Sequence, residues 1–323
     1  MTPWNLLALP PLPLDAIRGL LAPLGDTVTV RAARDRASML KALGEAEIVL
    51  GDWSGTLALD AEAVRAAPRL AFVQQPSVGV DMYDLAALSA AGVPLANTAG
   101  VSAVAVSEWC VGATLALARR LPEADAAVRA GRWPQLDLGP SELSGSRVGI
   151  VGFGAIGTAC ARLFGAFGCE VSYWTRTPRA ETYGAVHRPL AEVVAGSDVL
   201  VVVIALAAET RGLVDPSLMR PGSILVNAGR GEVVDQRSLV AALRSGHLRG
   251  AALDVYEEEP LPAGDPLREV NNVLLSPHVA GVTPEATGRL IGVVLDNVRA
   301  AIDGTPVAHV VNHVSARITR RLA

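Results

Sequence analysis

The stretch VGIVGFGAIG, residues 148–157, decides how this sequence folds. Its hydrophobic start predicts a short strand, and the G-x-G-x-x-G motif leads into a helix, which is the setting in which this motif binds a dinucleotide. The three glycines would allow the tight turn, the approach of a pyrophosphate and close helix–strand packing, while the helix N-terminus offers amide groups to the phosphates. A glycine-rich turn without a ligand is the alternative, which this context disfavours. The residues expected to hold the cofactor here are Gly152, Gly154, Ala155, Ile156 and Gly157.

The segment EVSYWTRTPR, residues 170–179, bears on which dinucleotide is bound. An acid at the end of this second strand binds the ribose 2′-hydroxyl of NAD, whereas a nearby arginine accommodates the 2′-phosphate of NADP. Here Thr175, Arg176 and Thr177 follow the strand. We therefore expect NADP(H) to be preferred and NAD(H) to be possible, with Arg176 stacking on the adenine or pairing with the phosphate. The alternative is a solvated basic loop in a protein that accepts both cofactors.

Short hydrophobic runs alternate with helical patterns along all 323 residues. This alternation predicts an α/β fold with two doubly wound parallel-sheet domains. A long helical stretch, residues 102–121, separates the two blocks, and the tail after a last helix over residues 285–302 has nowhere to pair except the first domain. The expected strands are residues 5–9, 28–30, 47–51, 70–75 and 94–97 in the first block, and 147–152, 170–174, 198–205, 223–228, 250–255 and 272–277 in the second.

Composition excludes several classes of function. The net charge is −4 and no basic run is present, so a nucleic-acid partner is not expected. The longest apolar run, residues 199–208, is too short to span a membrane, and the N-terminus lacks the basic segment of a signal peptide. The 3 cysteines have no metal or redox spacing, which predicts reduced thiols in a cytoplasmic protein. The only lysine is Lys41, and without a G-x-x-x-x-G-K-[ST] loop or a lysine near a site, ATP hydrolysis by that route and pyridoxal chemistry are excluded.

Charged residues directly follow three strands of the second block. Arg230 follows SILVNA, an acidic run at 257–259 follows GAALDV, and His278 follows NVLLSP. Ligands of parallel sheets lie beyond the carboxyl ends of the strands, so these side chains are expected to meet. The arginine can bind a carboxylate with two parallel donors, and the histidine can act as a general acid–base whose pKa a neighbouring carboxylate raises. Each could alone be a surface or core residue, and the choice among the three glutamates stays open.

The other four histidines give no indication of a metal site. His187 is expected in a surface loop and His247 at a helix C-terminus, where a cation is favourable without a function. His309 and His313 lie four residues apart, but their segment is predicted to be extended, so that the two rings would not converge. No metal is therefore expected.

Four signatures resemble those of the D-isomer-specific 2-hydroxyacid dehydrogenases. They are VGIVGFGAIG, VNAGRGEVVD, ALRSGHLRGAALDVYEEEPLP and SPHVAG, and the likeness extends over essentially the whole chain. The resemblance implies a Rossmann cofactor domain inserted into a flavodoxin-like substrate domain, and a homodimer formed through the cofactor domain. The corresponding limits are residues 1–99 and 285–323 for the substrate domain and 100–284 for the Rossmann domain. The chain ends at Ala323, so the regulatory extension of long phosphoglycerate dehydrogenases is not expected.

The resemblance also assigns roles to individual residues. It makes Arg230 the substrate-binding arginine, His278 the acid–base and Glu259, directly before a proline, the partner of the histidine. A glutamate at 259, where relatives acting on formate carry glutamine, argues against a formate dehydrogenase. By the resemblance, the amides of Val78 and Gly79 would hold the substrate carboxylate, and Asp254 would lie near the nicotinamide amide. Ala228 is also expected to bind the cofactor.

The function expected from these features is hydride transfer between NAD(P)H and a 2-keto acid or D-2-hydroxy acid, such as glyoxylate, hydroxypyruvate or a relative. A cofactor-sensing binding protein of the corepressor type and a phosphite dehydrogenase are the alternatives. Trp53, in GDWSG, could contact a substrate side chain or pack at the domain interface. The family usually has Pro-Leu-Thr-Pro-Glu-Thr where this chain reads ALAAET, residues 205–210, so the adenosine-side wall could differ.

Overall fold

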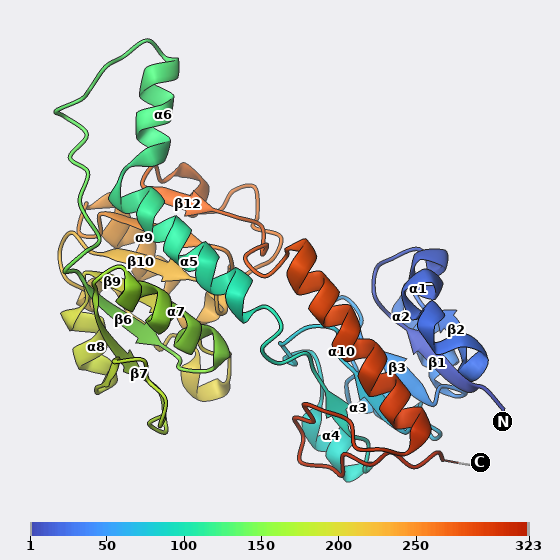
Figure 1. The fold of residues 1–323 in the computed structure, drawn as a ribbon. Helices are drawn as coiled ribbons and strands as arrows, with labels where there is room; N and C mark the ends of the chain where they lie inside the picture. The colour runs from blue at the N-terminus through green and yellow to red at the C-terminus, as the bar shows by residue number, and fades with distance from the viewer. Residues whose placement is uncertain (1, 322–323) are drawn as a thin grey trace. The chain divides into compact units, whose positions relative to one another are not determined.

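The computed structural model describes residues 2–321, which form two compact units (Figure 1). Unit 1 contains the described residues up to Val101 together with those from Pro284 onward, and unit 2 is Ser102–Thr283. Each unit is built on its own sheet of parallel strands, so the expected fold class is confirmed. No helix among residues 2–321 is long and apolar enough to cross a membrane.

The sheet of unit 1 has the strand order β2-β1-β3-β4-β5, a flavodoxin-like winding. Its strands are β1 (Trp4–Ala8), β2 (Val28–Ala32), β3 (Ile48–Leu50), β4 (Phe72–Gln74) and β5 (Leu95–Ala96). The C-terminal tail lies along this sheet, where Val310 forms an antiparallel bridge with Ala96 and the amide of Val311 donates to the Leu95 carbonyl at 2.9 Å.

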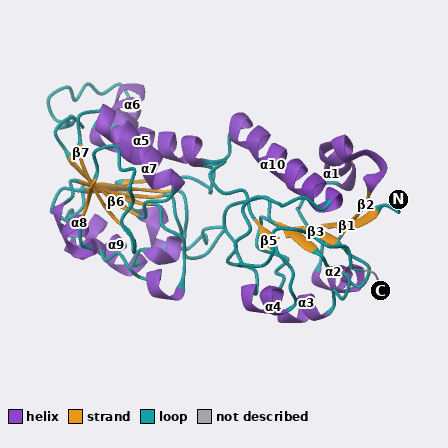
Figure 2. Ribbon diagram, turned by 60° about the horizontal axis from the view of Figure 1, so that its bottom comes forward, coloured by secondary structure: helices purple, strands orange, loops and turns teal. Residues whose placement is uncertain are grey.

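Helices cover both faces of this sheet (Figure 2). One face packs against α1 and α10, and the other against α2, α3 and α4. Aspartates 35, 60 and 84 cap α2, α3 and α4 by accepting a hydrogen bond from a first-turn amide, which fixes where each helix begins. The elements are α1 (Leu14–Leu21), η1 (Ala22–Thr27), α2 (Arg36–Leu43), α3 (Ala61–Arg65), α4 (Leu85–Ala90) and α10 (Pro284–Asp303).

The sheet of unit 2 has the order β12-β11-β10-β9-β6-β7-β8, with all neighbours parallel. This is the doubly wound arrangement in which the winding reverses between β6 and β9. The strands are β6 (Arg147–Val151), β7 (Glu170–Trp174), β8 (Val186–His187), β9 (Val199–Val202), β10 (Ile224–Asn227), β11 (Gly250–Leu253) and β12 (Val273–Leu275).

Alternate residues of these strands supply two hydrophobic cores. Val199 and Val201 of β9 face the helices α5 and α7, whereas Leu200 and Val202 face α8 and α9 (Figure 2). Helices on both faces explain why these strands are hydrophobic without interruption. The other elements of unit 2 are α5 (Ala103–Ala118), α6 (Leu121–Arg129), α7 (Ala155–Ala166), α8 (Leu190–Gly196), η2 (Ala208–Thr210), η3 (Pro216–Leu218), η4 (Gly231–Val233), α9 (Gln236–Arg244) and η5 (Pro266–Glu269).

Three local expectations are wrong. The helix predicted over 102–121 ends at Ala118, because Arg120 adopts a left-handed conformation with φ 51° and α6 begins beyond it. The strand predicted over 198–205 is regular only through Val202. The segment of His309 and His313 is not extended, since these residues have φ 61° and 56°.

Candidate active site

The loop after β6 has the shape that its three glycines predict. Gly152 has φ 98°, and a Cβ there would lie 2.7 Å from the backbone of Ile204. A Cβ on Gly157 would overlap the carbonyl oxygen of Gly152, so close helix–strand packing requires glycine. A Cβ on Gly154 would meet nothing within 4 Å. The loop therefore leaves open space beside the backbone of Gly154.

The helix that follows presents its N-terminus to this space. No side chain caps α7, whose N-cap residue is Gly154, so the first amides, including those of Ala155 and Ile156, have no side-chain acceptor from the cap. Such a helix end favours an anion. The residues of this loop thus fit the pyrophosphate of a dinucleotide.

The loop after β7 carries the residues expected to choose between NAD and NADP. The Arg176 guanidinium donates to the Glu209 carboxylate at 2.8 Å, and both side chains are exposed. Nε2 of His187 lies 3.1 Å from the carbonyl oxygen of Thr175. His187 is exposed, as expected, but it belongs to the edge strand β8 rather than to a loop, and its ring packs edge-on against Tyr173.

The strand register explains why residues far apart in sequence meet. The last residues of the six longer strands of unit 2 are partners of one another across the sheet: Trp174, Val151, Val202, Asn227, Leu253 and Leu275. The loops that follow them therefore begin at one edge. Arg230 follows β10, Glu259 follows β11 and His278 follows β12, and these three strands are neighbours.

His278 and Glu259 form a hydrogen-bonded pair. Nδ1 of the histidine lies 2.7 Å from one carboxylate oxygen of Glu259, and the other oxygen accepts the amide of Tyr256 at 3.0 Å. Among the three glutamates of the acidic run, the geometry therefore selects Glu259. The side chains of His278 and Glu259 are 51% and 36% exposed, so the pair can exchange protons with solvent.

The pair shifts the ionisation of both partners. The hydrogen bond to Glu259 raises the pKa of His278 above its usual value and outweighs burial, which acts in the opposite direction. For Glu259, burial alone would raise the pKa, but hydrogen bonds from His278 and the Tyr256 amide lower it below its usual value. The site thus favours the protonated form of the histidine.

Hydrogen bonds within the loop after β10 hold Arg230 in place. The Asn227 side-chain amide donates to the Arg230 carbonyl at 3.0 Å, and the guanidinium donates to the Gly229 carbonyl at 2.8 Å. A Cβ on Gly231 would overlap the backbone of Tyr256, so this glycine lets the loop approach the segment that carries the glutamate. The charge of Arg230 lowers the pKa of both His278 and Glu259, which places it within electrostatic reach of the pair.

Asp254 holds the segment that bears the histidine, a role that the sequence did not reveal. It is 2% exposed, and its carboxylate accepts from the Ser276 hydroxyl at 2.5 Å and from the amides of Val279 and Ala280 at 2.8 Å. The His278 amide donates to its carbonyl at 2.9 Å. These bonds hold His278 in a left-handed conformation, φ 53°, which is unfavourable for a residue with a side chain. The expected contact of Asp254 with a nicotinamide stays a prediction.

The remaining predicted residues also lie at carboxyl ends of strands. Ala228 directly follows β10, where its amide donates to the Val202 carbonyl at 3.1 Å. Val78 and Gly79 lie in unit 1 after β4, in a loop anchored by the hydrogen bond from the Asn97 side chain to the Val78 carbonyl. Trp53 lies after β3 and is 43% exposed. No group of three or more potential metal ligands occurs within residues 2–321.

Known proteins resemble this chain in sequence and structure. The family model described as D-isomer specific 2-hydroxyacid dehydrogenase, NAD binding domain, matches residues 111–280. A glyoxylate reductase of Aeropyrum pernix is 38% identical over 274 residues, which are 80% of this chain and 82% of that protein. A glyoxylate/hydroxypyruvate reductase of Arabidopsis thaliana is 38% identical over 77% of this chain and 82% of its own length.

Longer relatives and solved structures extend the likeness. A D-3-phosphoglycerate dehydrogenase of Mycobacterium leprae is 37% identical over 90% of this chain, which spans only 56% of that protein. The holo form of D-mandelate dehydrogenase from Rhodotorula graminis has a TM-score of 0.89 at 27% identity, with 98% of this chain and 100% of that chain covered. The relatives thus differ widely in the 2-keto or 2-hydroxy acids for which they are named.

Proposed function

The chain belongs to the family of D-isomer-specific 2-hydroxyacid dehydrogenases, and we propose that it reduces a 2-keto acid to the D-2-hydroxy acid with NAD(P)H. The observation that carries this proposal is the 2.7 Å pair of His278 and Glu259, within reach of Arg230. Glu259 and His278 follow β11 and β12, and the glycine loop follows β6; these strands end at the same edge of the sheet of unit 2. When bound, the reduced nicotinamide supplies the hydride.

Each residue of the trio has a distinct task in this proposal. Nδ1 of His278 is engaged with Glu259, so Nε2 is the nitrogen that delivers a proton to the carbonyl oxygen of the substrate. Glu259 keeps the histidine protonated and fixes the orientation of its ring. Arg230 binds the substrate carboxylate or carbonyl as a two-pronged cation, and the amides of Val78 and Gly79 hold the carboxylate. In the reverse direction, His278 accepts the hydroxyl proton.

The proposed cofactor is NADP(H), with NAD(H) as a weaker alternative. No acid follows β7, where Thr175 and Thr177 offer hydroxyl groups on either side of Arg176. Glu209 pairs with that arginine, so a 2′-phosphate would compete with one exposed carboxylate for the guanidinium. Ion pairs at the surface contribute little free energy, so replacing the Glu209 carboxylate by the 2′-phosphate as the partner of Arg176 costs little.

The cofactor preference is tested by kcat/KM for NADPH and NADH. We expect NADPH to be preferred by the wild-type protein and NADH by Thr175→Asp/Arg176→Ala. A wild-type preference for NADH would refute the assignment of Arg176, without touching that of the catalytic trio.

The reaction itself is tested with a panel of 2-keto acids by following the loss of reduced-nicotinamide absorbance. A corepressor-like binding protein would bind the cofactor without turnover, and a phosphite dehydrogenase would reduce the oxidised cofactor with phosphite. The relatives described above are named as reductases and dehydrogenases of 2-keto and 2-hydroxy acids, which does not favour either alternative.

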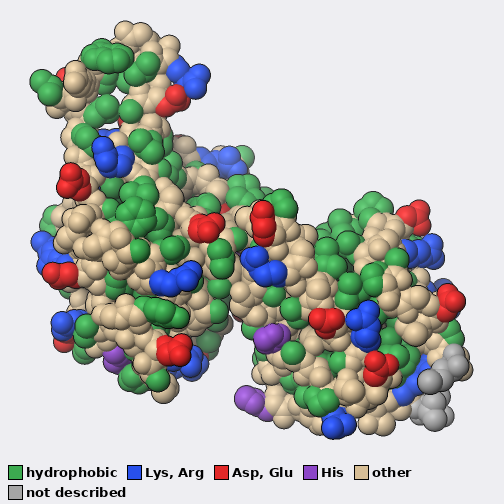
Figure 3. All heavy atoms as spheres, viewed as in Figure 1, with side chains coloured by type: hydrophobic (Ala, Val, Ile, Leu, Met, Phe, Trp, Pro, Cys, Tyr) green, Lys and Arg blue, Asp and Glu red, His purple; other side chains and the backbone are tan. Residues whose placement is uncertain are grey.

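A homodimer formed through unit 2 and a cytoplasmic location complete the proposal. Hydrophobic side chains are exposed on and after α6, where Trp133 is 77% and Leu136 is 92% exposed (Figure 3). Hydrophobic surface of this kind is typical of protein interfaces. The three cysteines are unpaired thiols, which is compatible with a reducing compartment.

A further inference from the structure

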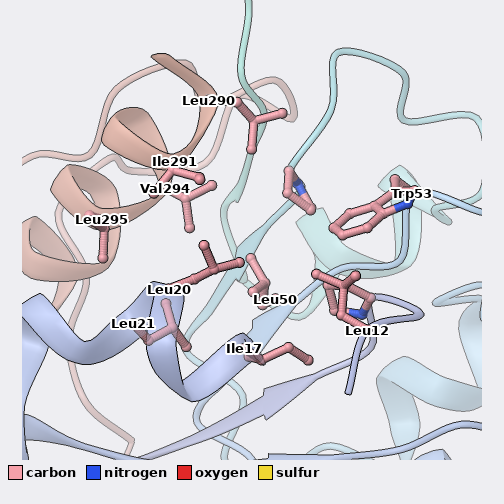
Figure 4. A pocket seen from close by; sticks show the side chains of 12 residues that line it. Leu12, Ile17, Leu20, Leu21, Leu50, Trp53, Leu290, Ile291, Val294 and Leu295 are labelled. Carbon is pink, nitrogen blue, oxygen red and sulfur yellow. The ribbon is translucent and has the colours of Figure 1, made fainter. Parts of the chain in front are cut away.

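A pocket in unit 1 has no part in the trio or the nucleotide loop. It contains about 400 Å³ of empty space, partly open to solvent, and lies between the sheet and the helices α1 and α10 (Figure 4). The Trp53 ring lies on the opposite side of the pocket from Ile291 and Val294 of α10 (Figure 4).

The pocket lies where doubly wound sheets bind ligands. In the order β2-β1-β3-β4-β5 the winding reverses between β1 and β3, and ligands bind beyond the carboxyl ends of the strands at such a point. The last residue of β1, Ala8, is the register partner of Leu50, the last residue of β3. Pro10, Leu50 and Pro76 all line the pocket, so it opens at the ends of β1, β3 and β4.

The lining determines which chemistry the pocket can accept. All 12 lining residues are Pro, Leu, Ile, Val or Trp, and the only polar side-chain atom among them is the indole nitrogen of Trp53. A hydroxyl, phosphate or carboxylate that entered would lose its water without gaining a matching set of partners. A branched aliphatic or aryl group would instead bury apolar surface.

The pocket shares a loop with the proposed carboxylate site. Pro76 lines the pocket, and Val78 and Gly79, whose amides are assigned to the carboxylate, follow in the same loop. The Asn97 side chain and the Val78 carbonyl form a hydrogen bond of 2.8 Å that holds this loop. A 2-keto acid bound to those amides would thus carry its side chain next to the pocket.

We propose that this pocket receives the side chain of the substrate, so that the enzyme prefers 2-keto acids with a branched aliphatic or aryl side chain. This inference rests on the proposed function and narrows it. Glyoxylate has no side chain to fill the pocket, hydroxypyruvate would bring an unpartnered hydroxyl, and a phosphorylated side chain would bring a charge that no lining residue neutralises.

The test is kcat/KM for glyoxylate, pyruvate, hydroxypyruvate, 4-methyl-2-oxopentanoate and phenylpyruvate at saturating cofactor. One methylene in a hydrophobic pocket changes kcat/KM by about 10- to 200-fold, so at least about a 10-fold advantage of 4-methyl-2-oxopentanoate over pyruvate is expected. Highest activity with glyoxylate or hydroxypyruvate would overturn this inference and leave the proposed function intact. No turnover of any member would overturn the proposed function and this inference together.

A variant ties the preference to the pocket. Leu20 of α1 lines the pocket and is 39% exposed, so Leu20→Arg is expected to fold while placing a charge against the bound side chain. The ratio of kcat/KM for 4-methyl-2-oxopentanoate to that for pyruvate should fall at least about 10-fold. This ratio does not depend on how much of the protein is active. Leu218→Arg, at a 64% exposed leucine of unit 2, is the matched control and should leave the ratio unchanged. An unchanged ratio in Leu20→Arg would remove the pocket from substrate binding.

Discussion

At the scale of single residues, His278 is the group on which proposed catalysis depends. Replacing it by alanine removes the only proposed proton donor and leaves the glycine loop after β6 intact. We expect His278→Ala to lower kcat for keto-acid reduction by about 100- to 10,000-fold. The dissociation constant of NADPH, measured by fluorescence titration, should stay within about threefold of wild type. Turnover close to wild type at neutral pH would remove this histidine from the mechanism.

Glu259 acts on the reaction through the pKa of His278. The carboxylate raises that pKa, and keto-acid reduction needs the protonated ring, so activity is lost as pH rises through the raised value. In Glu259→Gln the pKa of His278 falls, because the hydrogen bond and the charge of Glu259, which oppose the lowering by burial and by Arg230, are lost. The falling limb of the kcat/KM profile should therefore move to lower pH.

The neighbouring glutamates provide the control for this shift. Glu258 is exposed and belongs to the same acidic run, so Glu258→Gln changes the charge equally without touching the histidine. Its pH profile should match that of the wild-type protein. If the two variants shifted the profile alike, general charge rather than the 2.7 Å hydrogen bond would set the pKa.

Sequence patterns identify residues that follow the ends of strands, but they do not identify contacts between segments far apart in the chain. Arg230 and His278 were predictable, because parallel strands bring their carboxyl ends to one edge. The choice of Glu259 over its neighbours needed either the family resemblance or the structure, since three consecutive acids carry the same charge. The contacts of Asp254 with residues 276–280 and of Arg176 with Glu209 join segments more than twenty residues apart, and no local pattern encodes them.

At the scale of elements, a glycine in η4 controls how two loops approach each other. A Cβ on Gly231 would overlap the backbone of Tyr256, so Gly231→Ala must push Arg230 away from the segment that carries the glutamate. A displacement near 1 Å at a catalytic group costs roughly 100-fold in rate, and we expect kcat/KM to fall by about that factor. Steady-state kinetics on the folded variant, checked by circular dichroism, measures this effect.

A second glycine shows whether the effect is local. Gly165 lies in α7, where a Cβ would meet nothing within 4 Å. Gly165→Ala should leave kcat/KM unchanged and stabilise the protein by about 0.5–1 kcal/mol, since glycine is unfavourable in a helix. Comparable kinetics of the two alanine variants would contradict the proposed role of close loop packing.

Element boundaries were less predictable than element types. The strand β8 has two exposed residues at the edge of its sheet, so it lacks the hydrophobic run by which the other strands were identified. The end of α5 depends on the left-handed conformation of Arg120, a residue type that does not favour that conformation and so gives no signal. Gly168 and Gly246, a residue type that does favour it, directly follow the C-cap residues of α7 and α9 and have φ 79° and 73°.

At the scale of the whole molecule, the fold class and the family were both evident from the sequence. Alternating strands and helices predicted the two parallel sheets. A return of the tail to the first domain was expected because the tail had no partner of its own nearby, but its bridge from Val310 to Ala96 was not readable from the sequence. The strand orders were not readable from local patterns, since they depend on which faces the helices cover. The apolar pocket of unit 1 could not be predicted, because it depends on the strand order β2-β1-β3-β4-β5 and on the position of α10.

The proposed homodimer is a prediction at this scale. If the exposed hydrophobic side chains on and after α6 form the interface, a charge there should disrupt it. We expect Leu136→Asp to shift the mass in multi-angle light scattering from about twice that of the chain toward that of a single chain, because an unpaired buried charge opposes association. Leu218→Asp, at another exposed leucine, is the control and should remain dimeric. A wild-type monomer would refute the dimer itself.

The proposed reaction is the transfer of a hydride between a nicotinamide cofactor and carbon 2 of a 2-keto acid. The most direct test uses reduced cofactor carrying deuterium at both C4 positions, with the best keto acid of the panel, followed by mass spectrometry and chiral chromatography. We expect one deuterium at carbon 2 of a product with D configuration, formed at a rate that His278→Ala lowers by about 100-fold or more. A product without deuterium, or with L configuration, would contradict it.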